Sequence, residues 1–430
     1  MYVESLRIEN LRSFSKAEIG LLHPALRRRR GDEPLPRLRN VNVMLGINGS
    51  GKSTILDATA LSLLSPLIAS SGYRPYSLIR RSARGRIEEA AVKVDLALDE
   101  QDVWPDGPAA GKATMRVLIV RRGDVEFVQQ GDVGAPQFER LFYDDSAAFF
   151  FVGYGATRRV DVESTADGAT RRKLRHVRYE RVASLFEDHF TLTPLSAWLP
   201  EWRHRNRRRH DEAIALLGAL LPKSLRFTGR MENGEYLFAF HSTTVPFGAL
   251  SDGYRAYIGW VSDLLQHLCI AVSREPELAL QDCRGVVMVD EIDLHIHPEW
   301  QRTIIPTLAR KLPNLQFLFT THSPLVVGTL ERANIHVVER RRGFPIIRRP
   351  DEEVFGLSAD QILRSNLFGL DSTRDQSFKR KLDRLVRDAE LGDAAAALAF
   401  MRGASRGAAA IVDEADAPLE KRRAAGKLAR

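Results

Sequence analysis

The chain of 430 residues contains little cysteine and no long apolar run. Its two cysteines, Cys269 and Cys283, form no metal-binding pattern, and so low a count argues against a disulfide framework and fits a reducing compartment. No apolar stretch is long enough to cross a bilayer, and the N-terminal "MYVESLRIENLRSF" lacks the apolar core of a signal peptide. These absences predict a soluble, cytoplasmic protein without membrane contact.

The chain also lacks internal repeats and long heptad stretches, which argues against a coiled coil. Its length leaves room for about two or three domains. Lys and Arg total 63 against 55 Asp and Glu, which gives a formal net charge of +8. This surplus suggests an anionic partner such as nucleic acid, or only a soluble basic surface.

Two kinds of apolar pattern predict two groups of strands. "MYVESLRIENL" and the segment from Ala90 to Gln130 alternate as half-buried antiparallel strands do. "VNVMLG", "AAFFFVGYG", "GVVMVDEID" and "LQFLFTTHSP" are continuous apolar runs typical of buried strands. The patterns predict four regions: an N-terminal lobe with an antiparallel β subdomain (1–140), an inserted, mostly helical region (141–245), a C-terminal lobe (246–345) and a helical tail (346–430).

The stretch "LGINGSGKST" joins the strand "VNVMLG" to a segment with helical spacing, and it fits the pattern G-x-x-x-x-G-K-[ST]. Glycines in such a loop let backbone N–H groups surround phosphates, and the following helix presents its positive N-terminal end. Lys52 would reach the β- and γ-phosphates, and the Ser53 hydroxyl would bind Mg²⁺. The predicted nucleotide-binding residues are Asn48, Gly49, Ser50, Gly51, Lys52, Ser53 and Thr54.

Two polar sites follow the later buried strands. Asp290 and Glu291 come directly after "GVVMV", where Asp290 would hold Mg²⁺ and Glu291 would polarise an attacking water. His322 ends the next strand, and parallel strands would place it at the same edge of the sheet, within reach of a γ-phosphate. "LSDG" precedes a helix, so Ser251 is a candidate N-cap, with Gly253 in the first turn beside an anion site.

The motifs "GINGSGKST", "LSDGY", "VVMVDEIDLHIHP" and "TTHSP", in this order, resemble the ABC-type ATPases of the SMC, RecF and OLD group over roughly residues 1–330. The resemblance implies an α/β P-loop NTPase fold with a mixed-sheet core, binding of ATP with Mg²⁺, and ATP hydrolysis. It also implies a head-to-tail homodimer in which Ser251 and Gly253 act on the partner's nucleotide. Arg12 would touch the phosphates, His322 would be the switch histidine, and 293–298 the D-loop.

The chain departs from this group in three ways. Gln129, Gln130 and Gln137 are equal candidates for the Q-loop glutamine, and the coiled-coil arms with their Cys-x-x-Cys hook are missing. The tail also lacks the acidic clusters of the OLD nuclease domain. What remains resembles the stand-alone ATPases of bacterial anti-phage systems, the Septu ATPase among them, which work with a separately encoded HNH nuclease. The resemblance thus implies an ATPase that senses nucleic acid or controls an effector nuclease.

Two alternatives remain open at this point. One is a DNA-repair ATPase of the RecF type, and the other is a nuclease that uses Asp351, Glu352 and Glu353. Basic clusters are compatible with nucleic-acid backbone contact, especially Arg205 to Arg209, or with a solvated face. Trp202 would then stack on a base or simply pack in the core. The clusters comprise Arg27 to Arg30; Arg80, Arg81, Arg84 and Arg86; and Arg203, Arg205, Arg207, Arg208 and Arg209.

Overall fold

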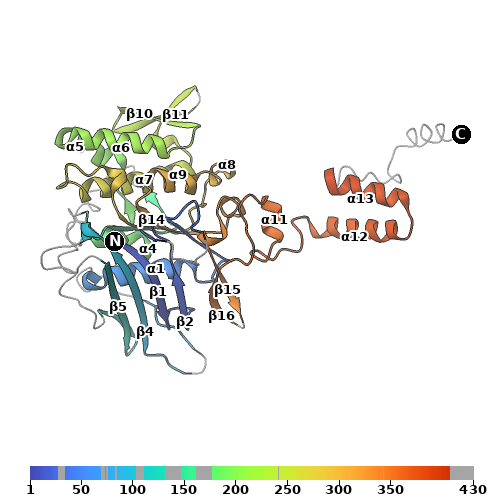
Figure 1. Ribbon diagram of the computed structural model, residues 1–430. Coiled ribbons are helices and arrows are strands. Elements are labelled where there is room, and N and C mark those ends of the chain that lie inside the picture. Colours follow the sequence, from blue (N-terminus) through green and yellow to red (C-terminus); the bar gives the residue numbers. More distant parts are fainter. Residues whose placement is uncertain are drawn as a thin grey trace. The chain divides into compact units, whose positions relative to one another are not determined.

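The computed structural model divides into two compact units, Met1–Ile362 and Leu363–Arg430, which are described separately (Figure 1). The described residues are 1–27, 34–68, 73, 76–82, 85–102, 111–130, 147–160, 177–240, 242–341 and 343–406. Among them, no helix combines the length and apolarity that crossing a membrane requires.

The first unit is built around a six-stranded sheet with the order β16-β15-β3-β14-β13-β7. All neighbouring strands are parallel except β16, which is antiparallel to β15. Phe319 of β14 pairs with both Val43 of β3 and Val289 of β13, so these strands end at the same edge, as predicted. The strands are β3 (Val41–Leu45), β7 (Phe151–Tyr154), β13 (Gly285–Val289), β14 (Leu315–Thr321), β15 (Ile335–Arg341) and β16 (Phe344–Arg348).

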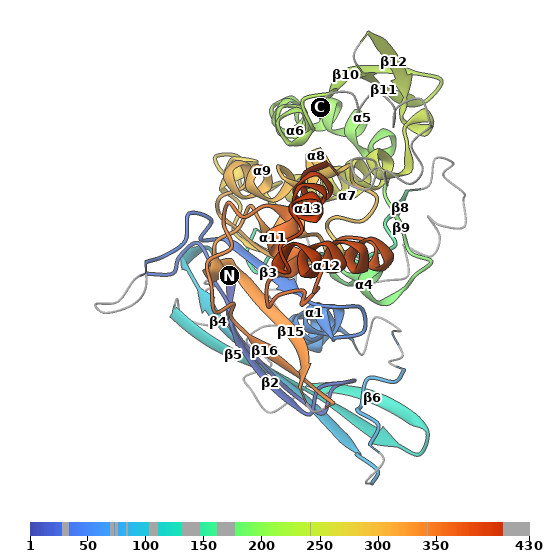
Figure 2. The same ribbon diagram turned by 90° about the vertical axis from the view of Figure 1, so that its right-hand side faces the viewer.

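A second, antiparallel sheet has the order β2-β1-β4-β5-β6 and confirms the predicted β subdomain. Helix α1 (Lys52–Ile68) contacts β4, β5 and β6 of this sheet and β14 of the central sheet, so its apolar side chains join both sheets in one core. Strand β16 runs beside β2 (Figures 1 and 2). The strands are β1 (Tyr2–Glu9), β2 (Lys16–Gly20), β4 (Glu89–Leu98), β5 (Gly111–Arg122) and β6 (Val125–Gln130).

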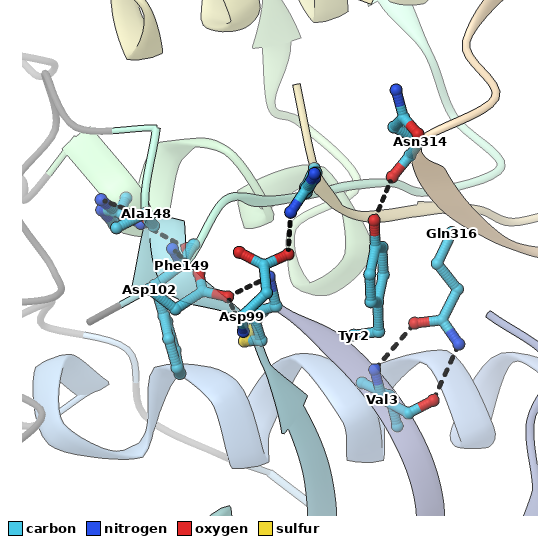
Figure 3. A network of polar contacts seen from close by, with 11 residues as sticks. Tyr2, Val3, Asp99, Asp102, Ala148, Phe149, Asn314 and Gln316 are labelled. Carbon is cyan, nitrogen blue, oxygen red and sulfur yellow. Dashed lines mark hydrogen bonds and ion pairs between the residues drawn. The ribbon is translucent and has the colours of Figure 1, made fainter. Parts of the chain in front are cut away.

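A polar network joins the start of β1 to the central sheet (Figure 3). The side-chain amide of Gln316 accepts from the Val3 N–H and donates to the Val3 carbonyl, both at 2.8 Å. The Tyr2 hydroxyl donates to the Asn314 carbonyl at 2.9 Å. Two further contacts lie in the same region: Arg284 with Asp99 at 2.7 Å, and the Phe149 N–H with Asp102 at 2.9 Å. Because the bonds of Gln316 to Val3 are buried, they tie the start of β1 to β14 and so help to fix how the two sheets meet.

The region between the lobes is not purely helical. The strand predicted in "AAFFFVGYG" is confirmed as β7, and it belongs to the central sheet rather than to an insert. The helices α5 (Leu195–Arg205) and α6 (Arg207–Leu220) pack against α7 (Asp252–Ala271), beside a small antiparallel sheet (Figure 1). That sheet contains β10 (Leu225–Glu232), β11 (Glu235–Phe240) and β12 (Thr243–Pro246). Apart from the start of the tail, the region boundaries predicted from sequence remain predictions.

The remaining elements are short, apart from those of the second unit. In that unit, α12 (Gln376–Glu390) packs against α13 (Ala394–Arg406), and the Asp375 carboxylate caps α12 by accepting from the Ser377 N–H at 2.8 Å. The predicted tail is helical in α11 (Ala359–Arg364), α12 and α13, but its predicted start is wrong, because residues 346–348 belong to strand β16. The short elements are α3 (Val177–Glu180), α4 (Ala183–Phe186), β8 (Arg159–Val160), β9 (Thr191–Leu192), α8 (Pro298–Gln301), α9 (Ile304–Lys311), α10 (Pro324–Val327) and α11 (Ala359–Arg364).

Candidate nucleotide site

The glycine loop between β3 and α1 has the backbone that a phosphate-binding loop needs. Gly49 and Gly51 adopt φ angles of 73° and 112°, which side chains disfavour. A Cβ on Gly46 would lie 2.2 Å from the Val338 carbonyl oxygen, so no larger residue fits there. The Ser50 hydroxyl is buried without a hydrogen-bond partner in the described structure, which fits a polar ligand beside the loop.

The predicted ligand residues differ in exposure along this loop. Asn48 and Gly49 are exposed, Ser53 is half-buried, and Lys52 and Thr54 are buried. Arg340 of β15, which the sequence reasoning missed, donates to the Gly49 carbonyl at 3.0 Å. The loop is thus open to solvent at its tip and held from the neighbouring strand.

Lys52 and His322 meet as the strand order predicts. The Lys52 Nζ lies 2.7 Å from His322 Nε2 and donates to the Ile47 carbonyl at 3.2 Å. Burial, with Lys52 as a second cause, lowers the pKa of His322, so its ring is neutral at pH 7 and can accept from the ammonium. Burial lowers the pKa of Lys52 too, although Asp290 and Glu291 act in the opposite direction.

Asp290 and Glu291 are held from two sides. From β14, the Thr320 hydroxyl accepts from the Glu291 N–H at 2.7 Å and donates to Asp290 Oδ1 at 2.5 Å. From the other side, Arg158 donates to the main-chain carbonyls of Asp290 and Glu291 at 2.7 and 2.9 Å. Glu291 has a φ of 46°, a left-handed conformation that is uncommon outside glycine. Neither Arg158 nor Thr320 was predicted.

The Arg12 side chain contacts α1, the helix that follows the glycine loop. Its guanidinium forms an ion pair with Asp57 of α1, and its backbone has a φ of 47°. Burial raises the pKa of the Asp57 carboxyl to about 7, while Arg12 beside it favours the ionised form. The predicted contact of Arg12 with phosphates therefore remains a prediction, in which Arg12 would exchange this carboxylate for a nucleotide.

The segment 250–253 begins α7 as predicted, but the cap differs. Ser251 occupies the N-cap position, yet its side chain accepts no capping hydrogen bond, and the residue is exposed. Asp252 is ion-paired with Arg255 instead. A Cβ on Gly253 would lie 2.0 Å from the His295 carbonyl oxygen, so the helix start is seated on segment 293–298. Among the described residues, no hydrogen bond connects Ser251 or Gly253 to the glycine loop of the same chain.

The candidate glutamines and several arginines are only partly placed. Gln129 lies on β6 opposite Leu118. Gln137 and the side chain of Gln130 lie outside the described residues, as do Arg28 to Arg30 and Arg84.

The cluster from Arg205 to Arg209 needs a correction. Arg209 is 1% exposed, pairs with Glu212 at 2.7 Å and donates to the Glu275 carbonyl at 2.7 Å. The prediction that it contacts nucleic acid is therefore wrong, because its donors are used inside the protein. Trp202 is buried and packs in the core, with Arg205 over its ring at 5.3 Å.

The acids proposed for a nuclease do not form a metal site. Asp351 and Glu352 are exposed, and the Glu353 carboxylate accepts from the backbone N–H groups of Arg332 and Phe355. Within the part of the chain that the structure describes, no group of three or more His, Cys, Asp or Glu residues could hold a metal ion.

Comparison with known families matches both halves of the site. The family described as "AAA domain, putative AbiEii toxin, Type IV TA system" matches residues 142–328, and a second AAA domain family matches residues 5–103. The first match contains Asp290, Glu291 and His322, and the second contains the glycine loop. Both halves of the site therefore lie in regions similar to AAA domains, and the resemblance to P-loop ATPases predicted from the motifs is confirmed.

Among individual proteins, the chain is similar to the Septu protein PtuA of Bacillus mycoides (strain KBAB4), with 23% identity over 385 residues, which is 86% of this chain and 45% of that protein. It is also similar to the Retron Vc95 probable ATPase of Vibrio cholerae serotype O1 biovar El Tor, with 38% identity over 114 residues, 26% of this chain and 22% of that protein. The chain spans less than half the length of these relatives.

Solved structures with a similar chain path include an SMC head bound to the C-winged helix domain of ScpA, at 16% identity and a TM-score of 0.48, covering 81% of this chain and 98% of that one. Another is the SMC head domain from Thermotoga maritima, at 14% identity and a TM-score of 0.44, covering 82% and 100%.

Proposed function

We propose that this protein binds ATP with Mg²⁺ at residues 46–54 and hydrolyses it. The observation that carries the proposal is the convergence of three strand ends, where Lys52 and His322 lie 2.7 Å apart beside the acid pair. Lys52 binds the phosphates, Glu291 polarises the attacking water, and His322 contacts the γ-phosphate. Ser53 and Asp290 would hold Mg²⁺, which would neutralise charge on the phosphates.

The second part of the proposal is a homodimer that completes each site. Ser251 is exposed and accepts no cap bond, so its hydroxyl and the N–H groups of the α7 start are available to an anion. Because they are not bonded to the glycine loop of their own chain, they suit the γ-phosphate bound by a second copy. ATP between the copies then holds the dimer together, and hydrolysis releases it.

The test is the Glu291→Gln variant, studied by light scattering and by phosphate release. We expect hydrolysis to fall by about 100-fold or more while ATP binding persists, because the variant keeps the fold but loses the base. ATP should therefore convert the variant to a lasting dimer. Glu352→Gln, which changes an exposed acid outside the site, is the matched control and should behave as wild type. Normal hydrolysis by Glu291→Gln would show that the base is wrongly assigned.

The biological role we propose is control of an effector in anti-phage defence. The similarity to proteins named Septu protein PtuA and Retron Vc95 probable ATPase supports this role. The partner would be a separately encoded HNH-type nuclease. Co-purification with such a protein from the neighbouring gene, with and without ATP, tests the pairing. Binding that ignores both ATP and the Lys52→Ala variant would argue against nucleotide control.

We further propose that nucleic acid contacts the exposed arginines of α5, α6 and β10. A cavity of about 380 Å³ between α5 and α6 is lined by Arg203, His204 and Arg207, among others. Exposed cations of this kind suit a phosphate backbone. Arg203→Glu with Arg207→Glu should weaken DNA or RNA binding and flatten its salt dependence. Equal binding by this variant and wild type at several salt concentrations would exclude the site.

A further inference from the structure

Arg158 is a buried cation that none of the predicted roles uses. It follows β7 after a short turn and is only 6% exposed. Its two terminal nitrogens donate separately to consecutive main-chain carbonyls, those of Asp290 at 2.7 Å and Glu291 at 2.9 Å. A planar guanidinium can make two such bonds at once, whereas an ammonium on a flexible stem holds no comparable orientation.

The backbone that Arg158 holds is the part of the acid pair most in need of support. Glu291 lies just past the end of β13 with a φ of 46°, a conformation that persists only when surrounding contacts fix it. Thr320 accepts from the Glu291 N–H, and Arg158 donates to the Glu291 carbonyl. The two contacts bind both polar groups of that one residue, so they set the direction in which its carboxylate leaves the main chain.

The strand pairing explains how a residue so distant in sequence reaches this place. The Asp290 N–H donates to the Tyr154 carbonyl at 2.8 Å, which aligns the ends of β7 and β13. Gly155 then turns the chain, and a Cβ there would lie 2.0 Å from the Ser184 carbonyl oxygen. Burial lowers the pKa of Arg158 to about 10, so it is charged at pH 7 beside Asp290 and Asp293.

We infer that Arg158 is a positioning residue for nucleotide hydrolysis: its paired N–H donors fix the main chain of Asp290 and Glu291 and so hold the Glu291 carboxylate toward the attacking water. The inference rests on the proposed function, since it assigns Glu291 as the base. Arg158 contacts main-chain oxygens of the acid pair, so its effect on the reaction passes through Glu291.

The test compares Arg158→Met and Arg158→Lys with the control Arg159→Met, which changes the exposed neighbour on β8. We expect Arg158→Met to lower kcat by about 100-fold, as small misplacements of catalytic groups do, with the Kd for a fluorescent ATP analogue within about threefold of wild type. Arg158→Lys should restore only a small part of kcat, because it keeps the positive charge but loses the two parallel N–H donors of the guanidinium. Arg159→Met should match wild type.

A double variant separates positioning from general stability. In the Glu291→Gln background, Arg158→Met should cause little further loss of single-turnover rate, because both changes remove the same contribution. Full rescue by Arg158→Lys, an unchanged kcat in Arg158→Met, or an additive loss in the double variant would overturn the inference. If thermal melts show that Arg158→Met does not fold, the same comparison of single and double variants is made with Arg158→Lys, and its result decides whether the inference holds. Absence of hydrolysis by the wild-type protein would overturn the proposed function itself.

Discussion

The acid pair and the start of α7 differ in whether their polar groups are hydrogen-bonded within the chain. At the acid pair, Thr320 and Arg158 bind the N–H and carbonyl groups of Glu291 within one chain. At the start of α7, Ser251 is exposed and its hydroxyl accepts no cap bond. Most polar groups that folding buries are hydrogen-bonded within the chain, whereas exposed groups can bond to water or to another molecule.

The proposed site has two halves, and this difference indicates which of them a single chain can form without a second copy. The half that contains Lys52, His322 and the acid pair is already assembled by contacts within one chain. The half at Ser251 has a rigid base, because Gly253 is seated on segment 293–298, but an open outer side. The experiments below break one half at a time.

The largest effect should come from Lys52→Ala. This change removes the lysine of the G-x-x-x-x-G-K-[ST] motif, which would bind the phosphates. ATP binding should weaken by about 100-fold, since charge-assisted hydrogen bonds contribute up to roughly 3 kcal/mol. Isothermal titration would measure it. Lys311→Ala, at an exposed position, is the control and should bind as wild type. ATP binding by Lys52→Ala at wild-type affinity would show that the assembled half does not hold the phosphates.

Mixing two inactive proteins should test the open half. Lys52→Ala keeps an intact α7 start, and Ser251→Arg keeps an intact loop, so a mixed dimer has one complete site. Because ATP on the intact loop would join the two variants at that one site, the mixture should regain phosphate release well above the sum of the two variants measured alone. Each variant alone should stay inactive in phosphate release. If the equimolar mixture is as inactive as its components, the sites are not shared between subunits.

A moderate effect on stability is expected from Gly253→Ala. The new Cβ would meet the His295 carbonyl oxygen at 2.0 Å, so the helix start or segment 293–298 must shift. Overpacking of this kind costs about 1–3 kcal/mol of unfolding free energy. Gly218→Ala is the matched control, because its Cβ would meet nothing within 4 Å and it lies inside α6. That change should stabilise slightly. Equal urea midpoints for both variants would mean that the close approach is not rigid.

The smallest effect should appear as a pH dependence of the central sheet. Burial, and secondarily Arg349, lowers the pKa of His336 of β15 well below its ordinary value. Because the folded state disfavours the proton, this contribution is fully present above about pH 6.5 and stability falls as the pH drops below it, by at most about 1.4 kcal/mol per pH unit. Urea unfolding at pH 7.5, 6.5 and 5.5 measures it. His336→Gln should reduce the slope, and an unchanged slope would contradict the assignment.

Most of the assembled half was predictable, because each of its elements is local in sequence. The glycine loop, the acid pair and His322 each follow an apolar run, and parallel pairing brings such strand ends together. Alternation likewise predicted the antiparallel strands β1, β4 and β5.

Residues that act across the fold were not predictable. Arg158 is separated from the carbonyls it binds by 132 and 133 positions, and only the pairing of β7 with β13 brings them together. The sequence suggested that Arg209 was one of several exposed charges. Its position on α6 instead turns it into the protein, where it bonds to the Glu275 carbonyl and to Glu212. Sequence pattern shows charge, but the burial of a charge depends on distant acceptors.

In the proposed dimer, the contact between Gly253 and His295 would have a kinetic consequence. Segment 293–298 begins two residues after Glu291. Its Asp293 accepts from the hydroxyl of Thr321, the neighbour of His322, at 2.5 Å. In the proposed dimer, the α7 start seated on this segment would serve the other subunit's nucleotide. A change in one acid pair would then move the group that completes the opposite site. Hydrolysis should therefore be cooperative, with a Hill coefficient above one for ATP.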